Sequence, residues 1–139
     1  MTYKIISKYI KDISFEIPNT QTFTMLEKEI SNYKLNFDIK SSPLKNDVIE
    51  VDTILKLSPS SDLKKKMLCE INFTTIISLE NIKEKKELEK IVLVKIPQYI
   101  YPFLYETFIY LFKQSGLQNI SIEKKVDFQK MYEEQKIIK

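Results

Sequence analysis

Few side chains in this sequence could carry out covalent or acid–base chemistry. Its 139 residues include no histidine and one cysteine, Cys69. Histidine is the commonest general base and metal ligand, so its absence removes nucleophile–histidine pairs as well. Cys69 sits in an alternating apolar row, which predicts a buried thiol with no base to activate it.

Carboxylate pairs are the remaining candidates for general acid–base catalysis. They occur at Glu50 and Asp52, at Glu27 and Glu29, and at Glu133 and Glu134. Each pair is explained more simply as a solvent-exposed face. The one glycine in the sequence argues against a glycine-rich phosphate-binding loop, and no ligands are grouped for a metal. The sequence therefore predicts a protein that is not an enzyme and that needs no cofactor.

Composition indicates one globular domain in a reducing compartment. The chain is 43% hydrophobic and 12% aromatic, which is ample for one core. A lone cysteine cannot form an intrachain disulfide, and the N-terminus lacks a basic region followed by an apolar one, so we expect a cytoplasmic protein. The net charge of +3 is spread over lysines interleaved with acids, which favours a solvated surface over a nucleic-acid interface.

Four segments alternate apolar and polar residues in the manner of half-buried strands. They lie at about residues 3–17, 30–40, 48–57 and 66–79. In the second, Tyr33, Leu35, Phe37 and Ile39 alternate with polar residues, which is the cleanest pattern in the chain. Short connections favour antiparallel pairing, and residues 18–29 are expected to form a crossover, with Asn19, Thr20 and Thr22 as turn formers.

Three helices are predicted after the strands, at about residues 83–95, 99–113 and 126–137, with Pro97 ending the first and Gly116 ending the second. The second helix is apolar almost all round, and such a helix must be buried on most sides. A membrane span would need about 20 apolar residues, but prolines and charged residues interrupt this stretch. We therefore expect homo-oligomerisation through this helix, with its apolar residues in the oligomer interface or the core, namely Phe108, Leu111 and Phe112.

Five stretches of the sequence resemble the SecB family of protein-export chaperones, and they follow one another along the chain in the same order as in the family. Residues 9–19 read Tyr-Ile-Lys-Asp-Ile-Ser-Phe-Glu-Ile-Pro-Asn, and residues 67–71 read Met-Leu-Cys-Glu-Ile. Further similarity lies at residues 46–51, at 101–106 and at 126–132. The resemblance implies an α+β fold, with a four-stranded antiparallel sheet followed by helices packed on one face, assembled as a homotetrameric dimer of dimers.

The resemblance also implies a function, an ATP-independent chaperone that binds unfolded preproteins and delivers them to the SecA translocation ATPase. It assigns SecA docking to Asp12, Glu16, Leu68 and Glu70. The alternation of apolar and polar residues independently supports this assignment. It places Asp12 and Glu16 on the outward face of the first strand, and Leu68 and Glu70 on the outward face of the fourth.

The opposite face of the fourth strand carries Cys69, Ile71 and Phe73. The resemblance implies a role for this stretch in tetramer assembly, although core packing explains it equally well. An apolar groove for clients is expected to include Phe23, Met25, Tyr99 and Tyr101, with core packing again the alternative for each. Two other functions stay open, a chaperone dedicated to one client such as an antitoxin, and an oligomeric adaptor without holdase activity. Neither nucleic-acid binding nor stable membrane insertion is expected.

Overall fold

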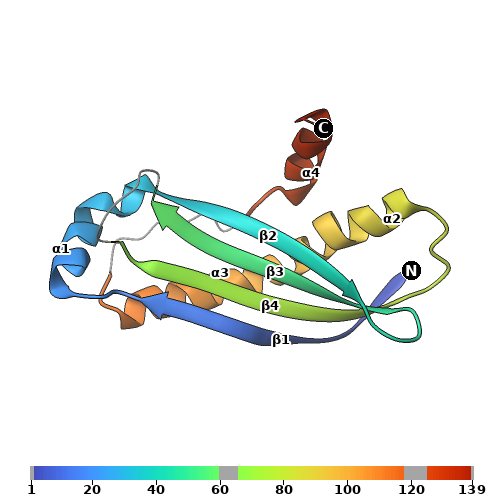
Figure 1. The fold of residues 1–139 in the computed structure, drawn as a ribbon, viewed down its shortest axis with the longest axis horizontal. Coiled ribbons are helices and arrows are strands. Elements are labelled where there is room, and N and C mark those ends of the chain that lie inside the picture. The colour runs from blue at the N-terminus through green and yellow to red at the C-terminus, as the bar shows by residue number, and fades with distance from the viewer. Residues whose placement is uncertain (1, 60–65, 118–124, 139) are drawn as a thin grey trace.

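The computed structural model of the chain describes residues 2–59, 66–117 and 125–138. A four-stranded antiparallel sheet lies against a long helix (Figure 1). The strands are β1 (Tyr3–Glu16), β2 (Tyr33–Pro43), β3 (Val48–Pro59) and β4 (Leu68–Leu79), in the order β1-β4-β3-β2. The predicted fold class is confirmed, and β1 and β2 form the two edges of the sheet.

Strand β1 is long and carries two β-bulges. Its register with β4 shifts between Ile5 and Ser7, and again between Ile10 and Asp12. Each bulge inserts one residue and changes which residues of the alternation face the helices. Lys11 is the extra residue of the second bulge. Past it, Asp12 faces outward as the sequence predicts, opposite Asn72 of β4.

The crossover after β1 is helical, which the sequence reading did not predict. Helix α1 (Thr20–Glu29) continues into a 3-10 turn, η1 (Ile30–Asn32), so β2 begins at Tyr33 rather than near residue 30. Asn19 caps α1, since its Oδ1 accepts a hydrogen bond of 2.8 Å from the Thr22 backbone N–H. Residues interpreted as turn formers therefore begin a helix.

The second part of the chain is helical without a break from residue 85 to residue 114. It comprises α2 (Lys85–Lys90), the π-helical segment η2 (Ile91–Lys95) and α3 (Ile96–Gln114). Pro97 was expected to end the first helix. Proline has no N–H to donate to the helix. The N–H of the preceding residue, Ile96, bonds to the Ile91 carbonyl five residues back, which makes a wider, π-helical turn. The wide turn lets the helix continue past Pro97.

Helix α3 ends as the sequence predicts, at the one glycine. Gly116 has a φ of +90°, in the region that L residues rarely adopt. The Leu117 N–H bonds to the Phe112 carbonyl at 3.1 Å, which closes the helix end. Helix α4 (Phe128–Ile138) follows, and the Asp127 carboxylate accepts a hydrogen bond from the Lys130 N–H at 3.0 Å.

The main core lies between the inward face of the sheet and α3. Side chains of β3 and β4 supply the sheet half of this core, and α3 supplies the other half, including Ile100, Leu104, Phe108 and Phe112. A second, smaller cluster joins Val94, Tyr101 and Phe128, so α4 is anchored beside β2 rather than under the centre of the sheet.

Candidate docking face and client-binding pocket

The four predicted docking residues lie together at one end of the outward sheet face. In the register of β1 and β4, Glu16 is opposite Leu68, and Ser14 is opposite Glu70. Leu68 is 46% exposed, with Glu16 opposite it on β1 and Glu70 two residues along β4. An exposed apolar side chain among charges is a small anchor of the kind that docking surfaces use.

The carboxylates at this end of the sheet face have few hydrogen-bond or ion-pair partners within the described part of the chain. Asp12 accepts a hydrogen bond from the Ser14 hydroxyl at 2.9 Å. Within the part of the chain that the structure describes, neither Asp12, Glu16 nor Glu70 forms an ion pair. Lys56 of β3 stands opposite Glu70 in the register. This end of the face therefore presents three carboxylates and one lysine, Lys56.

The centre of the outward face holds a polar cluster that the sequence reading missed. Lys11 Nζ lies 3.2 Å from Glu50 Oε1 and 3.3 Å from Asp52 Oδ2. These two hydrogen bonds raise the pKa of Lys11. Glu50 and Asp52 had been interpreted as plain solvated acids. Their partner lies 39 to 41 residues away and two strands across, so no local pattern indicates the contact.

The inward residues of β4 lie in the core, as the sequence predicts. Cys69, Ile71 and Phe73 are buried beneath α3 together with Phe108 and Phe112, and Leu111 is half-buried at the margin. Burial raises the pKa of the Cys69 thiol to about 12, which makes it a poor nucleophile. These contacts are core packing within one chain.

The structure does not bring the four expected groove residues together. Met25 of α1 is 41% exposed, while Phe23 is half-buried and close to Gly116 at the end of α3. Tyr99 is exposed near the start of the same helix, so the two pairs belong to opposite ends of α3. Tyr101 is only 2% exposed and belongs to the second core cluster, where it does not line a surface.

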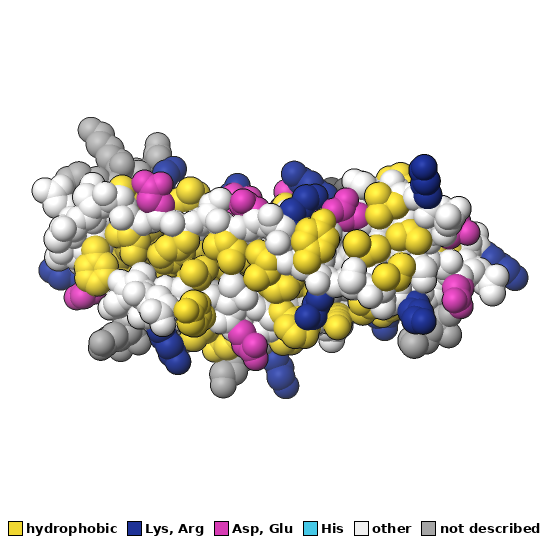
Figure 2. Space-filling view, turned by 90° about the horizontal axis from the view of Figure 1, so that it is seen from below, with side chains coloured by type: hydrophobic (Ala, Val, Ile, Leu, Met, Phe, Trp, Pro, Cys, Tyr) yellow, Lys and Arg dark blue, Asp and Glu magenta, His cyan; other side chains and the backbone are white. Residues whose placement is uncertain are grey.

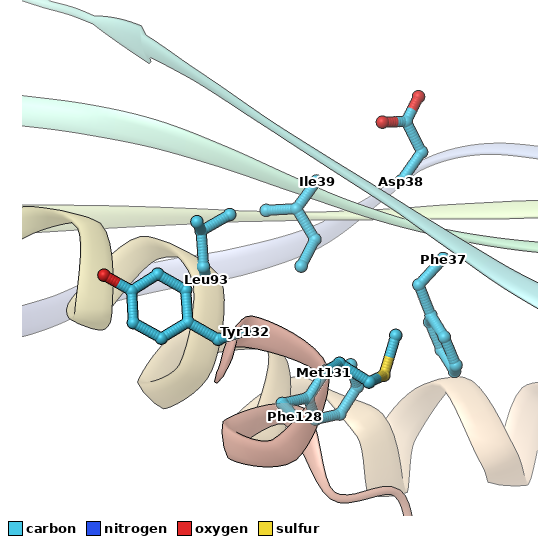
Figure 3. Close-up of a pocket in the computed structure, with 7 residues that line it drawn as sticks. All are labelled: Phe37, Asp38, Ile39, Leu93, Phe128, Met131 and Tyr132. Carbon is cyan, nitrogen blue, oxygen red and sulfur yellow. The ribbon is translucent and has the colours of Figure 1, made fainter. Parts of the chain in front are cut away.

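A pocket of about 260 Å³ lies instead between β2, η2 and α4 (Figure 3). Six of its seven lining residues are apolar or aromatic, namely Phe37, Ile39, Leu93, Phe128, Met131 and Tyr132, with Asp38 at its edge, but polar atoms make up the larger share of the surface that the pocket exposes. The Asp38 carboxylate points away from the other side chains in Figure 3. The lining therefore offers both apolar and polar contacts, and the methionine can adapt to different shapes.

One hydrogen bond ties the pocket wall to the helix beside it. The Tyr132 hydroxyl donates to Glu89 Oε2 at 3.0 Å, joining α4 to α2. The pocket was not predicted, because it depends on how α4 approaches a strand about 90 residues earlier in the sequence. The alternation of β2 had already identified Phe37 and Ile39 as inward residues.

Apolar side chains also form an exposed band along the β1 side of the molecule (Figure 2). The exposed apolar residues of this band include Ile6, Ile10 and Ile13 of β1 and Tyr99 and Tyr110 of α3; Tyr9 is also exposed, but its hydroxyl donates to Glu50 on the outward sheet face. Lys8 lies within this region, with its ammonium 4.0 Å from the centre of the Phe103 ring. A band of this length beside an open strand edge is typical of an interaction surface.

Neither a metal centre nor a membrane-spanning helix is found among the described residues. No group of three or more histidine, cysteine, aspartate or glutamate side chains there could hold a metal ion. No helix there is both long and apolar enough to cross a membrane.

Comparison with solved structures shows the fold of a SecB-like chaperone. One matching structure is the Mycobacterium tuberculosis Rv1957 SecB-like chaperone in complex with a ChAD peptide from the Rv1956 HigA1 antitoxin. Its TM-score is 0.67 at 12% sequence identity, over 90% of this chain and 88% of that one.

Sequence comparison then gives the family. The family model described as "Preprotein translocase subunit SecB" matches residues 1–138, and the chain belongs to the SecB family. The "Putative protein-export protein SecB" of Pelagibacter ubique (strain HTCC1062) is 45% identical over 133 residues, or 95% of either chain. The "Protein-export protein SecB" of Anaplasma marginale (strain Florida) is 26% identical over 143 residues, covering 95% of this chain and 81% of that protein.

Proposed function

We propose that this protein is an ATP-independent, cytoplasmic chaperone that binds unfolded preproteins, keeps them competent for translocation and delivers them to SecA. Family membership supports the export role. The observation that carries the proposal is the separation of two surfaces. The apolar pocket and band lie on the helix side and at the strand edge, and the acidic patch lies on the outward sheet face.

Clients bind, in this proposal, by burying their own apolar side chains in the pocket and along the exposed apolar residues. Burial of apolar surface is favourable without any nucleotide, and it is indifferent to sequence. Met131 gives the pocket an adaptable wall, and Phe128 gives it a rigid one. Met25 and Tyr99 extend the client surface toward both ends of α3, whereas Tyr101 contributes only by supporting Phe128.

SecA docks, in this proposal, on Asp12, Glu16, Leu68 and Glu70. Three carboxylates around one exposed leucine complement a basic segment with an apolar side chain. This surface faces away from α3, so a client and SecA can be bound at the same time.

The working form is proposed to be a homotetramer, a dimer of dimers. A sheet covers only one side of α3, and the other side exposes Tyr110. Together with the apolar band of β1, this is apolar surface that a second copy of the chain would cover. Cys69, Ile71 and Phe73 support assembly by holding the sheet against α3.

The test is a refolding assay without ATP. A reduced, unfolded test protein is diluted into buffer with and without the chaperone, and the recovery of its native fluorescence is followed. We expect slower recovery with wild type and weaker retardation with Met131→Glu, which places a charge in the pocket. Lys130→Glu, on the exposed side of the same helix, is the matched control. If wild type leaves the refolding rate unchanged, the holdase proposal is wrong.

A chaperone dedicated to one client is the second candidate. The observation in its favour is that the structural match is bound to a peptide from an antitoxin. A dedicated protein would protect that one partner and leave generic unfolded proteins unaffected in the same assay.

A further inference from the structure

The polar cluster at the centre of the outward face gives each of two carboxylates two hydrogen-bond partners. We name it the Lys11 cluster; it consists of Tyr9, Lys11, Glu50, Asp52 and Thr74. Besides the two ion pairs of Lys11, the Tyr9 hydroxyl donates to Glu50 Oε1 at 3.2 Å. The Thr74 hydroxyl donates to Asp52 Oδ1 at 2.8 Å. Each carboxylate therefore has one cation and one hydroxyl as partners.

The bulge in β1 is what allows Lys11 to reach these carboxylates. Lys11 has no partner residue in β4, because the register passes from Ile10 opposite Phe73 directly to Asp12 opposite Asn72. Its side chain crosses β4 and reaches β3, where Glu50 and Asp52 lie. The lysine is thus placed on the face by an insertion, beside the docking residue Asp12.

The Lys11 cluster lies close enough to the carboxylates of Asp12, Glu16 and Glu70 to change the electrostatic potential around them. Asp12 is opposite Asn72, which is opposite Ile54 on β3, and Asp52 is two residues from Ile54. That offset along a strand is about 7 Å, and two strand spacings add about 10 Å, so the backbones of Asp12 and Asp52 lie about 12 Å apart. The Debye length is about 8 Å at physiological salt and about 30 Å at 0.01 M ionic strength. A basic partner held at Asp12 therefore experiences the charges of Glu50 and Asp52 most strongly at low salt.

We propose that Lys11 is a specificity-determining residue of the docking face, because its single positive charge offsets half of the negative charge of Glu50 and Asp52 and thereby favours binding of a basic partner at the Asp12–Glu16–Glu70 end. The inference rests on the proposed docking of SecA. The occupant it commits to is a positively charged segment with an apolar side chain for Leu68. Without Lys11, the acidic surface would extend to the centre of the sheet.

The other lysines of the face do not replace Lys11. Lys40 of β2 is opposite Asp52 in the register, but its ammonium lies 3.8 Å from Asp38. Lys56 lies opposite Glu70, at the acidic end. Lys11 alone, within the described ranges, pairs with both Glu50 and Asp52.

The test is the dissociation constant of the chaperone for purified SecA, measured at several salt concentrations. Lys11→Gln should bind SecA about threefold more tightly at low salt, with a steeper salt dependence. Adding Glu50→Gln and Asp52→Asn to that variant should remove the gain, because the released carboxylates cause it. Glu50→Gln with Asp52→Asn alone should bind about threefold more weakly, since Lys11 is then uncompensated.

A separate variant distinguishes failure of this inference from failure of the docking proposal. Glu16→Gln weakens SecA binding if SecA docks on this face. If Glu16→Gln weakens SecA binding while Lys11→Gln leaves the affinity unchanged or reduced, the proposed role of Lys11 is wrong and the docking proposal stands. If Glu16→Gln has no effect, docking on this face is wrong, and the inference falls with it. Should Lys11→Gln fail to fold, the Glu50 and Asp52 double variant decides alone, and unchanged affinity there overturns the inference.

Discussion

Phe37 of β2 and Phe128 of α4 pack edge to face, with their ring centroids 5.1 Å apart. Tyr101 of α3 completes the contact at 5.7 Å from Phe37 and 6.1 Å from Phe128. This aromatic trio anchors α4, and two of its rings, Phe37 and Phe128, line the pocket between α4 and β2 while Tyr101 supports them from the core. The position of the C-terminal helix and the shape of the proposed client site therefore depend on the same three rings.

Phe128→Ala should release α4 and open the pocket. Removal of a buried phenylalanine typically costs about 3 to 5 kcal/mol in the free energy of unfolding. We expect a loss toward the lower end, because this cluster is small and separate from the main core. Urea unfolding measures it, and Lys130→Ala on the exposed side of α4 is the control. Equal stability of the two variants would contradict the anchoring role.

Cys69 should react with thiol reagents only when the protein unfolds. Its thiol is buried, and its pKa is raised to about 12, so the reactive thiolate is scarce at neutral pH. We expect labelling at the rate of unfolding in native buffer and fast labelling in denaturant. Fast labelling of the native protein would show that the sheet opens beneath α3.

The raised pKa of the Cys69 thiol predicts that the protein loses stability at alkaline pH. A folded-state pKa raised from 9.0 to about 12 favours folding at all pH values below 9, and this contribution is lost as pH rises toward 12. The full difference is about 4 kcal/mol. The measurement is the difference in unfolding free energy between wild type and Cys69→Ala from pH 7 to pH 11. It should shift in favour of the alanine variant above pH 9, and a constant difference would refute this.

Gly116→Ala should destabilise the end of α3. An added Cβ would meet the Phe23 ring at 3.5 Å, an ordinary contact, so the cost comes from the φ of +90°. We expect a loss of about 1 kcal/mol, measured by thermal unfolding. Gln114→Ala, exposed two residues earlier, should have little effect. A neutral Gly116→Ala would mean that the helix end adapts freely.

The sequence predicted those parts of the fold that local patterns encode. The alternation in β2 and β4 identified the inward residues Phe37, Ile39 and Ile71, and the glycine marked the end of α3. Local patterns also placed Glu16 and Leu68 on the outward face. The register shows them directly opposite each other.

Other features could not be predicted, because they depend on long-range contacts or on competing local signals. Helix α1 was missed because its first residues, beginning with the cap Asn19, are also common in turns. The pocket depends on α4 meeting β2, and the Lys11 cluster depends on a bulge and on a partner two strands away. Tyr101 was misplaced because an aromatic near a helix start can face either surface or core.

The central claim is that the chaperone holds an unfolded chain without nucleotide. Native mass measurement of the purified protein, with and without an excess of a reduced, unfolded polypeptide, tests it most directly. The account predicts a particle of four 16.5 kDa chains that gains one client chain in the absence of ATP. A monomer whose mass does not change when the client is added would contradict both the assembly and the chaperone function.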